Sequence, residues 1–414
     1  MNSVAIKRST ARESWLDRLG RRLVLAQLSR LRDGQLIIKD PAGEHTFGQP
    51  TERCPLSASI EVVDTSMYAE FAFGGNVAAG ESYMRGMWRA DDLAKVTQIF
   101  SANLAVLQDV ERGVGARLKS FARRRLHGLN KNSRSGSQRN IRAHYDLGNE
   151  FFRLFLDESM MYSSAVFPEA DASLEDASFH KNELLCKKLA LRPDDHLLEI
   201  GTGWGGFAIH AARRFGCRVT TTTISAEQHA EAQKRVQQAG LTDRVELLTT
   251  DYRDLEGQYD KLVSIEMIEA VGHHYLDTYF QKCASLLKPD GLMALQAITV
   301  PAQRYEYARD NVDFIKRYIF PGGFLPSVEA IAGAVKRRTD MEFAHLEEIG
   351  MHYGETLRHW RDRFASQLAE VRRQGYPETF IRMWEYYLCY CEGGFRERVI
   401  GATQLVLAKP GYRS

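Results

Sequence analysis

The chain has 414 residues, of which 44% are hydrophobic, so it exceeds one ordinary domain and predicts two domains with sizeable cores. Its net charge of +2 excludes a strongly acidic or basic protein, and its six cysteines form no CxxC pair, which indicates a reducing compartment and no metal site. The sequence has no run of 18 apolar residues and its first thirty residues are charged, so we expect neither a membrane span nor a secretory signal, and a cytoplasmic location.

The N-terminal part, to residue 108, predicts a small α+β accessory domain. Ser14 precedes apolar residues at helical spacing that begin with Trp15, which is typical of a capped amphipathic helix. This part holds no catalytic constellation, which favours a packing or docking module and leaves a lipid-carrier role open. Three strands are expected, the first two as a hairpin: 34–40, 44–48 and 58–63.

A basic segment over residues 109–138 follows, and we interpret it as a linker. Residues 112–142 hold ten Lys or Arg and no acidic residue. Such a run is typical of a solvated face, and alternatively it attracts anionic lipid head groups, with about 1 kcal/mol for each cation near the surface. No nucleic-acid reader motif or interleaved aromatic residues accompany the charge, so nucleic acid is not an expected partner.

Strands alternate with helices in the second part of the chain, which is typical of a parallel sheet. The strand-like runs are 197–200, 217–223, 244–250, 259–265 and 291–298. Ligands of open parallel sheets bind outside the carboxyl ends of the strands. Polar side chains occur at or just past these ends: Glu199, Thr223, Asp251, Glu266, Glu269 and Gln296.

A glycine-rich loop follows the first of these strands directly. Gly201, Gly203 and Gly205 lie between the apolar strand and an apolar helix that begins near Phe207. Closely spaced glycines allow the backbone to approach a ligand, and the amide dipoles of the helix point toward it. The loop predicts a nucleotide-like cofactor, or alternatively only a tight turn. The acid expected about 20 residues later in a dinucleotide site is replaced by Thr223, which argues against NAD.

Further motifs follow in a characteristic order. They are AHYDLGN at 143–149, MYSSA at 161–165, the glycine loop, TISAEQ at 223–228, DYRDL at 251–255, EMIEAVG at 266–272, FIKRYIFPGG at 314–323, and His352-Tyr353. Together they resemble the cyclopropane-fatty-acid synthase family of S-adenosylmethionine-dependent methyltransferases, including the phospholipid synthases. The resemblance implies an α/β fold: a Rossmann-like class I methyltransferase domain over 139–414, with a mostly parallel seven-stranded sheet, after a smaller N-terminal α+β domain.

The resemblance also implies a set of residues that bind S-adenosylmethionine. The glycines would hold its methionine and ribose part, and a preceding loop would close over it. Asp251 would accept a hydrogen bond from the adenine amino group, although an N-cap role is the alternative for this residue. The full set expected to bind the cofactor is Tyr162, Ser163, Glu199, Gly201, Gly203, Gly205, Thr223, Gln228, Asp251 and Tyr252.

Members of the family transfer the sulfonium methyl group to a cis double bond of a phospholipid acyl chain and then remove a proton to close a cyclopropane ring. The family's base is bicarbonate, held by a Cys, a Glu, a His, a Tyr and a backbone amide. The Glu, the Tyr and the amide correspond to Glu269, Tyr353 and Ile298. The Cys and the His are replaced by Ser164 and Gln296, which still form hydrogen bonds, so a small oxyanion could remain bound.

These replacements leave the product open between a cyclopropane and an acyl chain methylated without ring closure. A soluble small-molecule methyltransferase and a non-catalytic lipid-binding protein are further alternatives. We expect unsaturated phospholipid acyl chains as substrate, peripheral association with the inner face of the membrane through the basic surface, and a possible homodimer. An aromatic-rich insertion at about 300–345 would bind the acyl chain or form ordinary core.

Overall fold

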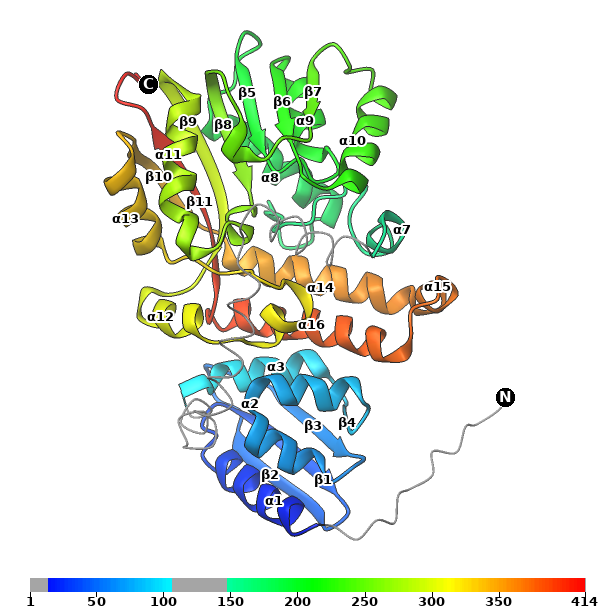
Figure 1. Ribbon diagram of the computed structural model, residues 1–414. Helices are drawn as coiled ribbons and strands as arrows, with labels where there is room; N and C mark the ends of the chain where they lie inside the picture. Colours follow the sequence, from blue (N-terminus) through cyan, green and yellow to red (C-terminus); the bar gives the residue numbers. More distant parts are fainter. Residues whose placement is uncertain (1–13, 106–146, 414) are drawn as a thin grey trace. The chain divides into compact units, whose positions relative to one another are not determined.

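The computed structural model describes residues 14–105 and 147–413, which form two compact units (Figure 1). The first unit contains residues 14–105 together with 375–393, and the second contains residues 147–374 together with 394–413. The predicted basic linker, 109–138, lies outside the described residues. Within the described ranges, no helix is both long and apolar enough to cross a membrane.

The first unit is built on a four-stranded sheet with the order β2-β1-β3-β4. The first two strands form the predicted hairpin, and β3 pairs in parallel with β1. Ser14 caps the first helix through a reciprocal hydrogen-bonded pair with Asp17. The elements are α1 (Trp15–Leu28), β1 (Gly34–Asp40), β2 (Gly43–Gln49), β3 (Ser57–Val62), α2 (Met67–Met84), β4 (Trp88–Ala90) and α3 (Leu93–Ala102).

The helix α16 (Glu378–Arg396) lies near the end of the chain, but most of it belongs to the first unit. Tyr83 Oη donates a hydrogen bond to Glu385 at 2.7 Å, and Thr97 Oγ1 donates to the carbonyl of Cys389 at 2.7 Å. The sequence places this segment within the 139–414 domain. Tyr83 and Glu385 are 302 positions apart, and Thr97 and Cys389 are 292 positions apart. The local pattern of apolar residues in this helix therefore does not reveal these partners.

The second unit is built on a seven-stranded sheet with the order β10-β11-β9-β8-β5-β6-β7. The pairs β5–β6, β5–β8, β6–β7 and β8–β9 are parallel, whereas β11 is antiparallel to both of its neighbours. The expected mostly parallel sheet is therefore confirmed. The strands are β5 (His196–Ile200), β6 (Arg218–Thr222), β7 (Val245–Leu248), β8 (Tyr259–Ile265), β9 (Leu287–Thr299), β10 (Glu342–Glu348) and β11 (Gly401–Ala408).

Helices cover both faces of this sheet (Figure 1). Leu197 packs toward α8, α9 and α10, whereas Leu198 packs toward α11 and α13, because successive strand residues point to opposite faces. Both faces are apolar, which buries the sheet. The helices of this unit are α7 (Asn149–Phe152), α8 (Leu174–Lys188), α9 (Gly206–Phe215), α10 (Ala226–Gln238), α11 (Leu276–Leu286), α12 (Ala302–Asp310), α13 (Val328–Arg338), α14 (Gly350–Ser366) and α15 (Leu368–Arg373).

The insertion after β9 forms α12, a π-helical turn over Ile315–Ile319 and α13. Phe314, Ile319 and Phe324 of this segment are buried. Tyr305 and Tyr307 lie on α12, which has no buried residue. The buried rings serve as core in this conformation, and an acyl-binding role for the segment stays a prediction.

Candidate active site

The glycine loop adopts the backbone that its sequence predicts. Gly201, Gly203 and Gly205 have φ values of 106°, 52° and 83°, which L side chains rarely adopt. Among the described residues, no atom beyond its chain neighbours lies within 4 Å of the position that a Cβ would take at Gly203. The helix α9 begins directly after the loop. The loop therefore fits a ligand that approaches the backbone closely.

Glu199 lies at the end of β5 and is buried. Thr221 Oγ1 donates a hydrogen bond to Glu199 Oε2 at 2.6 Å, and burial raises the pKa of this carboxyl to about 8. The fully buried Lys181 of α8 opposes this rise by its charge and donates a hydrogen bond to Ser163 Oγ at 3.2 Å. Burial lowers the pKa of Lys181 to about 8, against the charges of Glu266, Asp157 and Glu199.

The residues predicted at the ends of β6 and β7 lie there and bond locally. Thr223 Oγ1 donates a hydrogen bond to Gln228 Oε1 at 3.0 Å, and both residues are buried. Asp251 accepts the backbone N–H of Arg253 and also pairs with its guanidinium, at 2.6 Å between Oδ2 and Nη2. The capping alternative for Asp251 is therefore present in the structure. The roles of these residues and of Tyr252 toward adenine stay predictions.

The predicted catalytic residues meet around Glu266, which immediately follows β8. The Ser164 backbone N–H and the Gln296 Nε2 both donate to Glu266 Oε1 at 2.8 Å. Tyr353 Oη donates to Glu266 Oε2 at 2.7 Å. Burial raises the pKa of Glu266, while these three hydrogen bonds and the charge of Lys181 oppose the rise. Donors from three separate segments thus bind one carboxylate.

Glu269 lies one short turn further along the chain. Its Oε1 accepts the Ile298 backbone N–H at 2.6 Å, whereas its Oε2 is buried and has no hydrogen-bond partner within residues 14–105 and 147–413. Burial, together with the neighbouring charge of Glu266, raises the pKa of Glu269 to about 8. The two carboxyl groups therefore differ in their surroundings: three donated hydrogen bonds stabilise the charged form of Glu266, whereas Glu269 accepts one hydrogen bond and has a pKa raised to about 8.

The sequence predicts Glu266 only as an acid at the end of a strand, with no role in the site. The signal that could have indicated a role is the pair of acids, Glu266 and Glu269, directly after that strand. The hydroxyl of Ser164, which was expected to hold an anion, instead donates to the carbonyl of Ala165 at 2.9 Å. Gln296 and Tyr353, whose side chains were also expected to hold bicarbonate, donate to Glu266, and the expected Ile298 N–H donates to Glu269. As placed, these donors do not fit a further anion, so no step is assigned to bicarbonate.

Aromatic rings gather beside the carboxyl pair. Tyr162, predicted to close over the cofactor, lies 5.3 Å from Trp360 and 6.4 Å from Phe320 between ring centroids. Tyr353 stacks on Phe395 at 4.4 Å and lies edge-on to Trp360 at 6.1 Å. The quadrupoles of such rings attract a cation that develops nearby.

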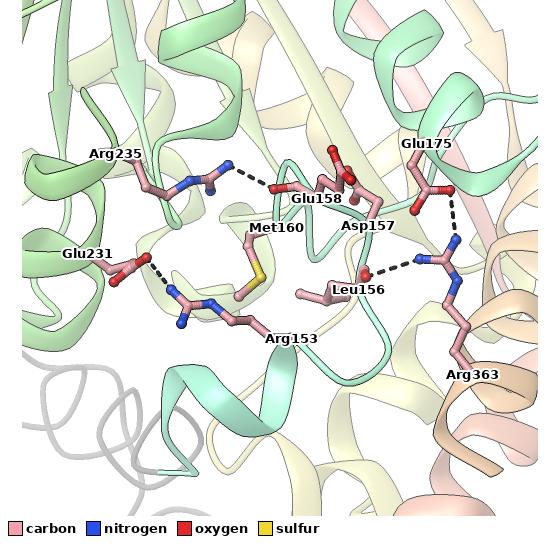
Figure 2. A pocket seen from close by; sticks show the side chains of 9 residues that line it. All are labelled: Arg153, Leu156, Asp157, Glu158, Met160, Glu175, Glu231, Arg235 and Arg363. Carbon is pink, nitrogen blue, oxygen red and sulfur yellow. Dashed lines mark hydrogen bonds and ion pairs between the residues drawn. The ribbon is translucent and has the colours of Figure 1, made fainter. Parts of the chain in front are cut away.

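Arginines hold the segment that precedes Tyr162, and Figure 2 shows Arg235 and Arg363 beside Leu156 and Glu158 of this segment. Arg235 donates to the carbonyls of Ser159 and Glu158, and Arg363 donates to the carbonyl of Leu156. A cavity of about 390 Å³ lies among these side chains and contains none of the predicted site residues. Since each of its arginines bonds to carbonyls or carboxylates of the chain, we interpret this region as the support of this segment. The residues lining it are Arg153, Leu156, Asp157, Glu158, Met160, Glu175, Glu231, Arg235 and Arg363.

Comparison with known proteins agrees with this geometry. A family model described as mycolic acid cyclopropane synthetase matches residues 132–405. The chain is 39% identical over 344 residues to the tuberculostearic acid methyltransferase of Mycobacterium tuberculosis, which covers 81% of this chain and 80% of the relative. It is 37% identical over 359 residues to the cyclopropane-fatty-acyl-phospholipid synthase of Escherichia coli K12, which covers 85% and 88%.

Solved structures of similar proteins show the same fold. A cyclopropane synthase from Mycobacterium tuberculosis is 30% identical, with a TM-score of 0.62 over 66% of this chain and 98% of that chain. A mycolic acid cyclopropane synthase in complex with SAH and CTAB is 29% identical, with the same TM-score and coverage. The chain therefore belongs to the mycolic acid cyclopropane synthetase family and is an S-adenosylmethionine-dependent methyltransferase.

Proposed function

We propose that this protein transfers the methyl carbon of S-adenosylmethionine to the cis double bond of an unsaturated phospholipid acyl chain and closes a cyclopropane ring. The observation that carries the proposal is the pair of carboxyl groups, Glu266 and Glu269, beside the aromatic rings at the carboxyl end of the sheet. The Escherichia coli relative, which is named for a fatty-acyl-phospholipid substrate, supports the choice of acceptor.

The cofactor would bind at Gly201, Gly203 and Gly205, with Tyr162 and Ser163 over it. When bound, it supplies the electrophilic methyl group. An alkene is a poor nucleophile, so the site must hold the double bond in line with the methyl group and exclude water. Faces of Tyr162 and Trp360 would stabilise the positive charge that develops on the acyl chain. A carboxylate near this charge then accepts a proton.

A peripheral membrane association on the cytoplasmic side fits the surface of α1. Trp15 is 65% exposed and Leu23 is 48% exposed, and Leu16 and Leu19 are exposed as well. The same helix carries the exposed Arg22. Large apolar side chains with basic residues on one helix are typical of segments that lie in the interface of an anionic membrane. The predicted contribution of residues 109–138 stays a prediction, as does a homodimer.

Methylation without ring closure is the second candidate. It is favoured by the 39% identity to the tuberculostearic acid methyltransferase, which is named for a methylated acid rather than for a ring. The same carboxyl pair could serve either outcome, because both begin with methyl transfer to the double bond and end with loss of a proton. The two candidates differ in where the electron pair of the broken C–H bond goes: it closes the ring in the first and forms a new carbon–carbon double bond in the second.

The deciding experiment is mass spectrometry of fatty acids from vesicles of monounsaturated phosphatidylglycerol after incubation with the protein and methyl-labelled S-adenosylmethionine. Chains that are heavier by one methylene, with a ring shown by fragmentation, support the synthase. A labelled methylene branch supports the second candidate. Labelled free fatty acid or small molecule, with no labelled phospholipid, contradicts the proposed acceptor.

A further inference from the structure

Glu266 occupies an anion-binding site built from this chain's own donors. Its two oxygen atoms receive the Ser164 N–H, the Gln296 amide and the Tyr353 hydroxyl, at 2.7–2.8 Å. Three donors converging on one carboxylate favour its charged form and fix its position. The chain thus supplies the anion as well as its binding site.

The orientation of Gln296 is fixed by the neighbouring strand. Gln296 on β9 lies directly opposite Gln404 on β11, and Gln404 Nε2 donates to Gln296 Oε1 at 2.9 Å. With its oxygen occupied in this way, the Gln296 amide nitrogen faces Glu266 and also the carbonyl of Ser164, at 3.1 Å. Both glutamines are fully buried, which shields these bonds from bulk water.

The backbone of Glu266 is strained. Its φ of 49° lies in the left-handed region, which is unfavourable for a residue other than glycine. Backbone strain of this kind persists where the surrounding structure demands a particular side chain, and it occurs at functional sites. Glycine would adopt this φ without strain. The presence of a glutamate here therefore indicates that the carboxylate itself is needed at this position.

We propose that the Glu266 carboxylate is the base of the reaction and stands where the family would hold bicarbonate, so that this protein needs no bicarbonate. The inference rests on the proposed methyl transfer. The π pair of the alkene forms a C–C bond as the methyl–sulfur bond breaks. A C–H bond of the transferred carbon then breaks, its electron pair closes the ring, and its proton passes to a Glu266 oxygen. No oxidant or further reactant is required.

The surroundings of the two carboxyl groups differ in a way that suits one base. Burial and the charge of Glu266 raise the pKa of Glu269 to about 8, which favours its protonated form, and among the described residues its buried Oε2 has no hydrogen-bond partner. Lys181 contributes a compensating positive charge. Two carboxyl groups with different protonation states are the arrangement in which one can accept a proton at neutral pH.

Three variants of the full-length protein test the inference. Glu266→Gln keeps the size of the side chain but removes the base. Glu266→Gly opens the anion site and suits the backbone. Arg398→Gly is the matched control, because Arg398 also has a positive φ, 53°, but is exposed. Initial rates of S-adenosylhomocysteine release are measured on phosphatidylglycerol vesicles in buffer purged of carbon dioxide, with and without added bicarbonate, formate or acetate.

We expect the wild-type rate to be the same with and without bicarbonate, and Arg398→Gly to match it. Glu266→Gln should lose at least about 100-fold in turnover, the scale of general-base catalysis, with unchanged affinity for S-adenosylmethionine. Glu266→Gly should be inactive in purged buffer and recover with a small carboxylate or bicarbonate. A wild-type rate that requires bicarbonate overturns the inference, as does a fully active Glu266→Gln.

A second measurement separates this inference from the proposed function. Carbon-13 NMR of labelled bicarbonate should detect binding to Glu266→Gly and none to the wild type or to Arg398→Gly, whatever the acceptor. Bicarbonate binding to the wild type, or none to the folded glycine variant, overturns the assignment of the site. Absence of any labelled lipid from the wild type, together with the expected NMR result, refutes the proposed acceptor and leaves Glu266 in the anion site.

Discussion

Glu269→Gln is expected to change how the stability of the protein depends on pH. In the folded protein, burial and the charge of Glu266 raise the pKa of Glu269 from 4.5 to about 8. Between these two values, the folded state holds a proton that the unfolded chain releases. The free energy of unfolding therefore falls as the pH rises through this window.

The magnitude follows from the slope of this linkage. One proton bound by the folded state alone lowers the free energy of unfolding by about 1.4 kcal/mol for each pH unit. From pH 5.5 to pH 7.5 the wild type should thus lose about 2.7 kcal/mol through this carboxyl. Glu269→Gln removes the proton uptake, while its amide oxygen can still accept the Ile298 N–H. The difference in free energy of unfolding between the variant and the wild type should therefore shift in favour of the variant by this amount from pH 5.5 to pH 7.5.

Urea unfolding at several pH values, followed by circular dichroism and by fluorescence, measures the difference. Because Glu266 and Glu269 interact, the difference belongs to the pair rather than to one residue. The matched control is Glu256→Gln, since Glu256 is exposed and its side chain lies outside the site. Parallel curves for the wild type and Glu269→Gln from pH 5.5 to pH 7.5 would refute a protonated, buried Glu269.

Three further changes test the cofactor loop, the buried lysine and the membrane helix. Gly203→Val should weaken S-adenosylmethionine binding at least about tenfold in calorimetry, because it strains a φ of 52° and fills open space; unchanged affinity would contradict a cofactor there. Lys181→Met should lower the free energy of unfolding by about 3–5 kcal/mol, since the Glu266 carboxylate loses a buried counter-charge; a loss below about 1 kcal/mol in urea would show that the charge is not needed. Replacing both Trp15 and Leu19 by Ala should weaken sedimentation with anionic vesicles at least about tenfold, and equal sedimentation would exclude α1 as the contact.

The sequence by itself determined the sheet and its ligand edge. Apolar runs separated by helices predicted β5 to β9, because a strand buried on both faces must be apolar along its length. Gly201, Gly203 and Gly205 predicted the loop, because their positive φ values are a local requirement that glycine meets. The family motifs brought Ser164, Gln296 and Tyr353 into one predicted site. Each strand, loop or motif was recognised from residues that lie close together in the chain.

Only the tertiary structure decided which carboxylate those residues surround. Glu266 and Glu269 follow the same strand, and no local pattern tells which one meets Ser164, Gln296 and Tyr353, which are 102, 30 and 87 positions from Glu266. The same holds for the pKa of each carboxyl, because burial and opposing charges come from distant segments. Most of α16 likewise joins the first unit through partners about 300 positions away. Side chains meet across a fold through packing, and packing is not encoded in the spacing of a single segment.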